Sequence, residues 1–186
     1  VGGKTGVDLG ALKNLVGVIN NPQGVVIYPD FLATLPTEEL RSGMAEMFKH
    51  GLISDEAYWH KMCNLSELTE AHLGSLIYES VVIKNKVVTQ DPTEKGLRKT
   101  LNYGHTLGHA IESYCLQNPN RERLLHGEAI AIGMVLATYL SVKELGFSMD
   151  KCDQVKAVLG EYFKKQDFSD EEITDICQLM RFDKKN

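Results

Sequence analysis

A histidine-rich stretch carries the residues whose types and spacing are best suited to chemistry. If residues 98–112 form one helix, its 100° per residue places five polar side chains within an arc of roughly 80°. These side chains belong to Arg98, Asn102, His105, His109 and Glu112. Two histidines four positions apart can present both imidazoles to one metal ion or anion. The Arg, Asn and Glu in register favour a chemical face over a merely solvated one.

Further candidate ligands for a metal lie on other predicted elements. Glu46 and Lys49 share a predicted helix, and His126 lies where the most hydrophobic helix of the chain begins. One carboxylate and two imidazoles drawn from His105, His109 and His126 would give three protein ligands and an open position, the pattern of catalytic zinc. Spacing alone does not choose among these ligands. For Glu46 and Lys49, a surface ion pair is the simpler interpretation.

Cationic side chains occur at positions where they could meet an anion. Lys84 interrupts the apolar stripe of a predicted helix, so it is either a snorkelling stem or a buried charge with a specific partner. Lys84, Glu94 and Arg98 can converge at the turn before the histidine-rich stretch. An open metal position beside cations suits an oxygen-rich anionic substrate, whose hydroxyls bind the metal while phosphate or carboxylate meets the cations. The candidate cations are Lys4, Lys13, Lys49, Lys84 and Arg98.

Composition favours an ordinary globular protein and argues against several classes of function. The 186 residues are 43% hydrophobic and 24% charged, with a formal net charge of −5. Nucleic acid and anionic membrane surfaces demand a large basic excess, so neither is an expected partner. The four cysteines lack CxxC spacing, as expected for reduced thiols in a cytoplasmic protein. The longest apolar run, Ala129 to Val142, is too short to span a bilayer.

The hydrophobic pattern predicts a mainly α-helical, multihelical domain with a short β segment near the N-terminus. Val25 to Tyr28 is the only stretch with convincing strand character. Helices are predicted to start at Pro36 and after Ser54, and to cover residues 70–89, 98–112, 124–146, 150–165 and 169–180. The last of them opens with an S-x-x-E capping box.

The first residues form a Gly-rich segment, Val1-Gly-Gly-Lys4-Thr5, of a type whose backbone N–H groups and ammonium can hold an oxyanion. It also looks like the end of a Walker A loop, with Asp30 placed after the predicted strand as in nucleotide hydrolases. No further feature of that class occurs. The chain opens on Val1 and stops within a polar run, so we expect a fragment of a larger protein.

Several motifs occur together and in an order that closely resembles the 3-dehydroquinate synthase family over the whole chain. They are Gly2-Gly-Lys-Thr5, Lys13-Asn14, Ala45-Glu46-Met-Phe-Lys49, the stretch from Arg98 to Glu112, and Leu125-His126-Gly-Glu128. Spaced motifs in a fixed order are far more specific than any one of them. We therefore expect residues 1–35 to be the end of a cofactor-binding region and residues 36–186 to be a helical domain that binds metal and substrate.

The resemblance implies a role for each matching residue. Glu46, His105 and His126 would bind Zn²⁺, with Co²⁺ as an alternative, while His109 would face the substrate. The residues implied to hold or act on the substrate are Lys4, Asn14, Lys49, Lys84, Glu94, Arg98, Asn102 and His109. Those implied to lie at the NAD cofactor are Lys4, Lys13, Phe31, Leu32, Ala33 and Thr34.

Enzymes of this family convert a phosphorylated sugar acid, 3-deoxy-arabino-heptulosonate 7-phosphate, to 3-dehydroquinate and phosphate in the shikimate pathway. The resemblance implies a lyase that uses NAD and zinc to oxidise an alcohol, eliminate phosphate, reduce the ketone again and close a ring by aldol addition. The family's N-terminal NAD domain is absent from this chain. We therefore expect the chain alone to be inactive and the full-length protein to be a homodimer.

Other functions would use a similar metal site. A sister cyclase such as 2-deoxy-scyllo-inosose synthase, or a metal-dependent polyol dehydrogenase, is one alternative. Lys84 and Arg98 favour a carboxylated substrate over these. A protein of another class, an inactive zinc-binding assembly module, would bind metal without depending on any cofactor.

Overall fold

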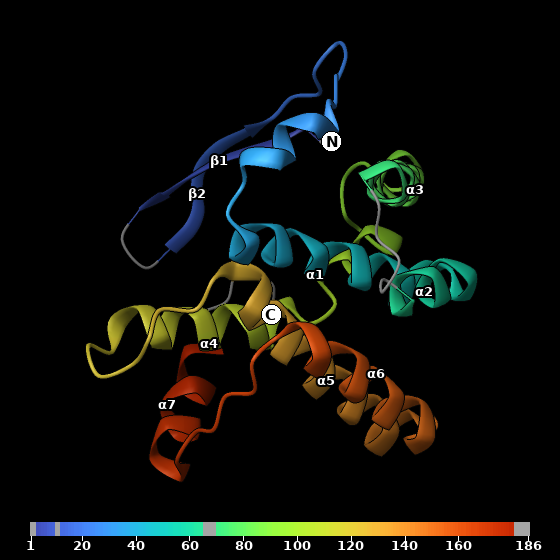
Figure 1. Cartoon of the computed structure of the whole chain (residues 1–186). Coiled ribbons are helices and arrows are strands. Elements are labelled where there is room, and N and C mark those ends of the chain that lie inside the picture. Colours follow the sequence, from blue (N-terminus) through green and yellow to red (C-terminus); the bar gives the residue numbers. More distant parts are fainter. Residues whose placement is uncertain (1–2, 10–11, 65–69, 181–186) are drawn as a thin grey trace.

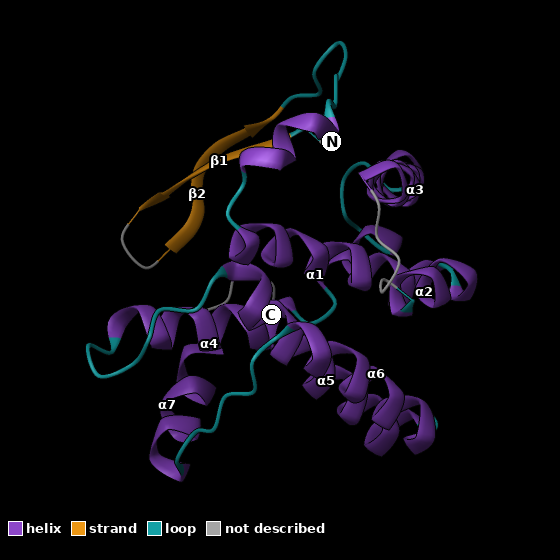
Figure 2. Ribbon diagram, in the orientation of Figure 1, coloured by secondary structure: helices purple, strands orange, loops and turns teal. Residues whose placement is uncertain are grey.

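The computed structural model describes residues 3–9, 12–64 and 70–180, and the fold is mainly α-helical, as predicted (Figures 1 and 2). A β-hairpin lies on one side of α1, and α4 to α7 lie on the other (Figure 1). The elements are β1 (Lys4–Leu9), β2 (Leu12–Ile19), the 3-10 helix η1 (Pro29–Thr34), α1 (Thr37–Ser54), α2 (Glu56–Cys63), α3 (Glu70–Gln90), the 3-10 helix η3 (Leu97–Asn102), α4 (His105–Gln117), α5 (His126–Leu145), α6 (Met149–Tyr162) and α7 (Asp170–Met180).

The Gly-rich start of the chain leads into a strand. β1 and β2 pair antiparallel, with Lys4 opposite Ile19 and Gly6 opposite Gly17. A Cβ atom on Gly17 would lie 1.9 Å from the carbonyl oxygen of Thr5, so this close pairing requires glycine. A Walker A loop must run into a helix, whereas Thr5 continues into β1. The nucleotide-hydrolase alternative is therefore wrong.

The strand predicted at residues 25–28 is also wrong. These residues are extended, but they pair with no strand in the part of the chain that the structure describes. Their apolar side chains are exposed, most of all Val26 at 96%. A strand forms only where a neighbour satisfies its N–H and C=O groups, and composition alone cannot supply that neighbour. The true strands were missed because their glycines and polar residues weaken the strand signal.

The helix termini follow local hydrogen bonding. Asp55, rather than Ser54, caps α2, since its carboxylate accepts from the N–H groups of Ala57 at 2.8 Å and Tyr58 at 3.1 Å. The predicted capping box of α7 is confirmed: Ser169 and Glu172 exchange bonds of 2.8 and 3.3 Å between side chain and backbone. None of the described helices is both long and apolar enough to cross a membrane.

The buried core has two parts that meet at α5. Phe48 of α1, Met62 of α2 and Met134 of α5 belong to the larger cluster, which α3 and α6 complete. Ile111 of α4 and Ile176 of α7 belong to the smaller one, which packs on the other side of α5. Helix α5 therefore holds the two groups of helices together.

Glycines bring the backbones of α4 and α5 into contact. A Cβ atom on Gly133 of α5 would lie 2.0 Å from the carbonyl oxygen of Gly104, and one on Gly108 would lie 2.7 Å from Ile130 Cδ1. Because Gly104 and Gly108 lack a Cβ atom, α5 can approach α4 closely at these positions. This contact places the histidines of α4 beside the start of α5.

The α4–α5 contact predicts opposite effects for two Gly→Ala substitutions in helices. Gly133→Ala should destabilise the chain by about 1–3 kcal/mol or more, because the new methyl group overlaps backbone atoms that cannot move aside cheaply. Gly160→Ala in α6 meets nothing within 4 Å, so helix propensity should stabilise the chain by about 0.5–1 kcal/mol. Urea denaturation of both variants measures the difference, and an equally tolerated Gly133→Ala contradicts the close contact.

Candidate metal and anion site

The histidine-rich stretch is not one continuous helix. Gly104 adopts a left-handed conformation with φ of 76°, η3 ends before it, and α4 begins at His105. The single polar face predicted from Arg98 to Glu112 is therefore wrong, because Gly104 interrupts the helix. His105 and His109 still lie side by side on α4, with ring centroids 5.2 Å apart.

Three imidazoles gather where α4 meets the start of α5. The His126 ring lies 5.5 Å from that of His105 and 5.6 Å from that of His109. One ligand nitrogen from each ring lies within 4.8 Å of the other two. The structure thus brings together the three histidines that the sequence offered as candidate ligands. Helix α1 fixes the position of His126, since the Gly127 N–H donates to Ser42 Oγ at 2.9 Å.

Hydrogen bonds orient two of these rings. His105 Nδ1 lies 3.2 Å from the carbonyl oxygen of Tyr103, and His126 Nδ1 lies 3.2 Å from Glu112 Oε2. A carbonyl or a carboxylate can only accept, so each Nδ1 carries a proton, and the tautomer of the neutral ring that fits this contact has its lone pair on Nε2. Metal-binding histidines are held in this way.

Glu46 of α1 completes the cluster. Its Oε2 accepts from Lys49 Nζ at 2.6 Å. Its Oε1 is buried without a hydrogen-bonded partner among the described residues, and it lies 3.4 Å from His105 Nε2. Ligand bonds of about 2.0–2.1 Å in a tetrahedral zinc site space neighbouring ligand atoms about 3.4 Å apart. The two lone pairs are thus spaced as two ligands of one ion, and the donor set fits a divalent metal.

The charge state of Glu46 suits that role. Burial alone would raise its pKa, but His105, when its ring is protonated, and the charge and hydrogen bond of Lys49 outweigh burial and hold the pKa of Glu46 well below its usual range. Lys49 is only 2% exposed, so the interpretation of Glu46 and Lys49 as a surface pair is wrong. Glu46 is an anion at neutral pH, as a carboxylate ligand must be.

Four side chains are therefore available for one ion. Among the described residues, the three histidines are the group whose ligand atoms all lie within 4.8 Å of one another, and Glu46 lies beside them through its 3.4 Å contact with His105. The ligand set of Glu46, His105 and His126, with His109 turned to substrate, stays a prediction.

The predicted substrate residues Glu94, Arg98 and Asn102 lie in the turn and the 3-10 helix η3 that precede α4. Asn102 Nδ2 donates to Glu94 Oε1 at 2.7 Å, and Arg98 is 5% exposed with Nη1 donating to the Pro92 carbonyl at 2.9 Å. Asp91, which sequence reasoning missed, organises the turn by accepting from the N–H groups of residues 95, 96 and 98. An aspartate ahead of Pro and Gly is the signal that could have revealed it.

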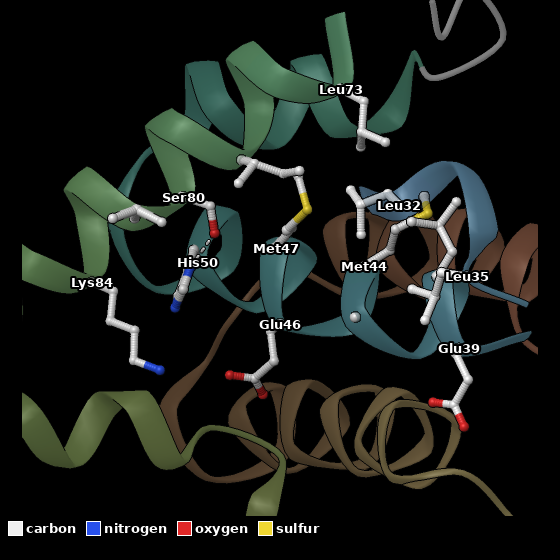
Figure 3. Close-up of a pocket in the computed structure, with 14 residues that line it drawn as sticks. Leu32, Leu35, Glu39, Met44, Glu46, Met47, His50, Leu73, Ser80 and Lys84 are labelled. Carbon is white, nitrogen blue, oxygen red and sulfur yellow. Dashed lines mark hydrogen bonds between the residues drawn. The ribbon is translucent and has the colours of Figure 1, made fainter. Parts of the chain in front are cut away.

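A cavity of about 330 Å³ lies between η1, α1 and α3 (Figure 3). One end is polar, with Glu46, His50 and Lys84, while the walls are mainly apolar. Lys84 thus lines a pocket that also holds a carboxylate, as expected for an inward-pointing lysine with an anionic neighbour. The sequence did not identify His50 as a residue of the site. Its partner Ser80 lies on α3, 30 residues further along the chain, and no local motif links the two.

The predicted cofactor residues lie on η1 and the hairpin. Leu32 lines the cavity, whereas Phe31, Ala33 and Thr34 are exposed. Phe31 packs edge-on against Tyr28, with ring centroids 5.3 Å apart. The remaining three residues lie on β1 and β2, where their side chains fall outside the described part of the structure; they are Lys4, Lys13 and Asn14. Contacts of these residues with a cofactor or substrate stay predictions.

The fold is shared with metal-containing sugar-phosphate cyclases. A crystal structure of 2-deoxy-scyllo-inosose synthase complexed with carbaglucose-6-phosphate, NAD⁺ and Co²⁺ superposes with a TM-score of 0.78 and 27% identity, covering 99% of this chain and 50% of the other. A 2-epi-5-epi-valiolone synthase from Streptomyces hygroscopicus with NAD⁺ and Zn²⁺ bound superposes with a TM-score of 0.78 and 26% identity. This match covers 97% of the present chain and 52% of the synthase. The chain therefore has the fold of the helical half of these proteins.

Sequence comparison resolves the family within that class. Residues 43–186 match the family model described as 3-dehydroquinate synthase C-terminal, and residues 1–42 match the one described as 3-dehydroquinate synthase N-terminal. The chain belongs to the 3-dehydroquinate synthase family.

Curated relatives agree with this assignment. The 3-dehydroquinate synthase of Parabacteroides distasonis is 44% identical over 188 residues, which cover 100% of this chain and 53% of the relative. That of Clostridium botulinum is 40% identical over 189 residues, with coverage of 100% and 53%. The chain thus spans about half the length of the curated relatives it matches.

The buried His50 predicts a loss of stability in mild acid. Burial, reinforced by the charge of Lys49, lowers the pKa of His50 from 6.5 to about 4. As the pH falls, His50 takes up a proton in the unfolded chain near pH 6.5 but in the folded chain only near pH 4. The free energy of unfolding is therefore unaffected by His50 above pH 6.5 and decreases as the pH drops toward 4. The loss should reach roughly 3 kcal/mol. Denaturation of wild type and His50→Gln between pH 7 and 4 measures it, and parallel pH dependences contradict the assignment.

Proposed function

We propose that this chain is the metal- and substrate-binding half of a 3-dehydroquinate synthase, which converts 3-deoxy-arabino-heptulosonate 7-phosphate to 3-dehydroquinate and phosphate. The observation that carries the proposal is the buried, unpartnered Glu46 Oε1 at 3.4 Å from His105 Nε2 in a chain of this family. Residues 1–35 belong to the cofactor-binding region and residues 36–186 form the catalytic helical domain.

In this proposal the ion is Zn²⁺ or Co²⁺, held by Glu46, His105 and His126. Related structures that contain NAD⁺ with Co²⁺ or Zn²⁺ support it, as do the Nε2 lone pairs that Tyr103 and Glu112 leave available. When bound, the metal acts as a Lewis acid that makes a substrate hydroxyl easier to deprotonate. Lys49 keeps Glu46 in place by its bond to Oε2.

The remaining polar residues of the site bind and orient the substrate. Lys84 and Arg98 hold its anionic groups, whose fixed position keeps the molecule aligned while its bonds rearrange. His109 faces the substrate and moves a proton at its ring nitrogen. Glu94 and Asn102, joined at 2.7 Å, hold hydroxyls beside Arg98. Lys49 adds positive charge near the developing anion.

The NAD cofactor is held mainly by the preceding half of the longer protein. From this chain, residues of the hairpin and η1 contribute to its binding, and the hairpin also reaches the substrate. These residues are Lys4, Lys13, Asn14, Phe31, Leu32, Ala33 and Thr34. We propose that the longer protein is a homodimer that acts in the cytoplasm. Free thiols at all four cysteines support that compartment.

A sister cyclase activity is the second candidate, because 2-deoxy-scyllo-inosose synthase shares the fold at a TM-score of 0.78. The identity of 44% to a curated 3-dehydroquinate synthase, against 27% to that cyclase, favours the first candidate. An inactive zinc-binding module would keep the metal site without needing NAD.

The deciding experiment is phosphate release by the longer protein that contains this chain. We expect release from the heptulosonate phosphate only when both NAD⁺ and the metal are present, and loss of release on chelation. Release from glucose 6-phosphate instead would favour the sister cyclase. Metal binding without any phosphate release would favour the inactive module.

Removing Glu46 tests the ligand set. Replacing a residue that only hydrogen-bonds to a metal ligand lowers metal affinity by roughly 10- to 100-fold. Glu46→Gln should lower zinc affinity by more than this, because it removes a charged ligand. His109→Ala should retain zinc and lose most activity. Atomic absorption after dialysis measures both variants, and zinc loss in His109→Ala would reassign the ligands.

Removing Lys84 tests the anion site. Lys84→Ala should raise the KM for the heptulosonate phosphate by about tenfold or more, since a paired charge in a pocket is lost, while leaving the NAD⁺ affinity unchanged. Lys86→Ala, at an exposed position of the same helix, is the matched control. Steady-state kinetics decide, and an unchanged KM in Lys84→Ala removes this residue from the substrate site.

A further inference from the structure

The polar end of the cavity contains a buried nitrogen without a partner. His50 is 3% exposed and lines the cavity, yet its Nε2 atom has no hydrogen-bonded partner among the described residues. Its other ring nitrogen, Nδ1, lies 2.7 Å from Ser80 Oγ of α3 (Figure 3). Buried polar atoms are seldom left unpaired, so this one requires an explanation.

A chain of polar contacts runs from His50 through Ser80 to Tyr58. It ends at the carbonyl oxygen of Leu76, which accepts from the Tyr58 hydroxyl at 3.0 Å. The Tyr58 proton is therefore directed at Leu76, which leaves the Tyr58 oxygen to accept from Ser80 and leaves Ser80 Oγ able to accept from His50 Nδ1–H. In that tautomer the lone pair of the neutral ring lies on Nε2.

The ring is neutral and has a cation nearby. Burial, with the charges of Lys49 and Lys84, keeps the pKa of His50 near 4, so Nε2 can accept a hydrogen bond at neutral pH. His50 and Lys84 extend toward the same end of the cavity from α1 and α3 (Figure 3). Apolar side chains such as Met47 and Ile77 form the adjoining walls.

We propose that His50 Nε2 accepts a hydrogen bond from a hydroxyl of the ligand whose anionic group Lys84 binds. The cavity thus selects a hydroxylated organic anion: the ammonium meets the negative charge, Nε2 takes the neighbouring hydroxyl, and the apolar walls contact the carbon skeleton. The proposal rests on the proposed function, because it assigns His50 to binding of the same substrate. Ser80 and Tyr58 act as positioning residues, since they fix the His50 tautomer without touching the ligand.

The tautomer can be measured without any ligand. Long-range ¹H–¹⁵N spectra of the labelled chain at pH 7 should show His50 protonated on Nδ1, and Ser80→Ala should shift the ring toward the Nε2–H form. His60→Gln, at an exposed site on α2, removes the resonance of an unrelated histidine and serves as control. An Nε2–H tautomer in wild type would overturn the proposal, because Nε2 would then be a donor.

Kinetics of the longer protein test the contact with the ligand. His50→Leu should raise the KM for the heptulosonate phosphate about tenfold, the loss of one buried hydrogen bond, with zinc content unchanged. His50→Gln, which can place an acceptor near the Nε2 position, should recover most of it. Substrate analogues that each lack one hydroxyl identify the group that His50 contacts. The analogue without that hydroxyl should bind equally well to wild type and to His50→Leu.

An unchanged KM in His50→Leu, or a failure of His50→Gln to recover it, contradicts the contact. If the wild-type protein releases no phosphate, the proposed function is wrong and the heptulosonate phosphate is not the ligand of His50. The tautomer spectrum then decides separately whether His50 presents an acceptor to the cavity.

Discussion

The Glu46 carboxylate joins α1 to α4, and the site depends on that junction. One oxygen accepts from Lys49 at 2.6 Å and the other lies 3.4 Å from His105 Nε2. A carboxylate with a buried oxygen is stabilised by compensating positive charge. Lys49 supplies it on one side, and a divalent ion between Glu46 and His105 supplies it on the other in the proposed enzyme. The same lysine raises the cost of protonating His50, so one buried cation keeps a carboxylate charged and an imidazole neutral.

Backbone contacts hold the histidines at the distances that this junction requires. The glycine contacts between α4 and α5 let the two helices approach until His126 lies beside His105 and His109. Bonds from Ser42, Tyr103 and Glu112 then fix the start of α5 and the orientation of the rings. Packing and chemistry are therefore linked, because a larger residue at Gly133 would move ligands that it does not touch.

The sequence predicted most of the helices from local periodicity, and residue type identified the three histidines as candidate ligands of one ion. It did not predict the break at Gly104, since glycine is compatible with both a helix and a left-handed residue. Val25 to Tyr28 was mistaken for a paired strand, because pairing depends on a neighbour that composition does not reveal. The contact of His50 with Ser80 was missed for a similar reason: neither residue has a local motif, and only the packing of α1 on α3 brings them together.

The most direct test of the central claim is zinc-edge anomalous diffraction from crystals of the zinc-loaded chain. The account predicts one strong peak within bonding distance of Glu46 Oε1, His105 Nε2 and His126 Nε2, with Lys49 still bound to the second carboxylate oxygen. A peak bonded to all three histidines, with Glu46 outside its coordination shell, would contradict the account.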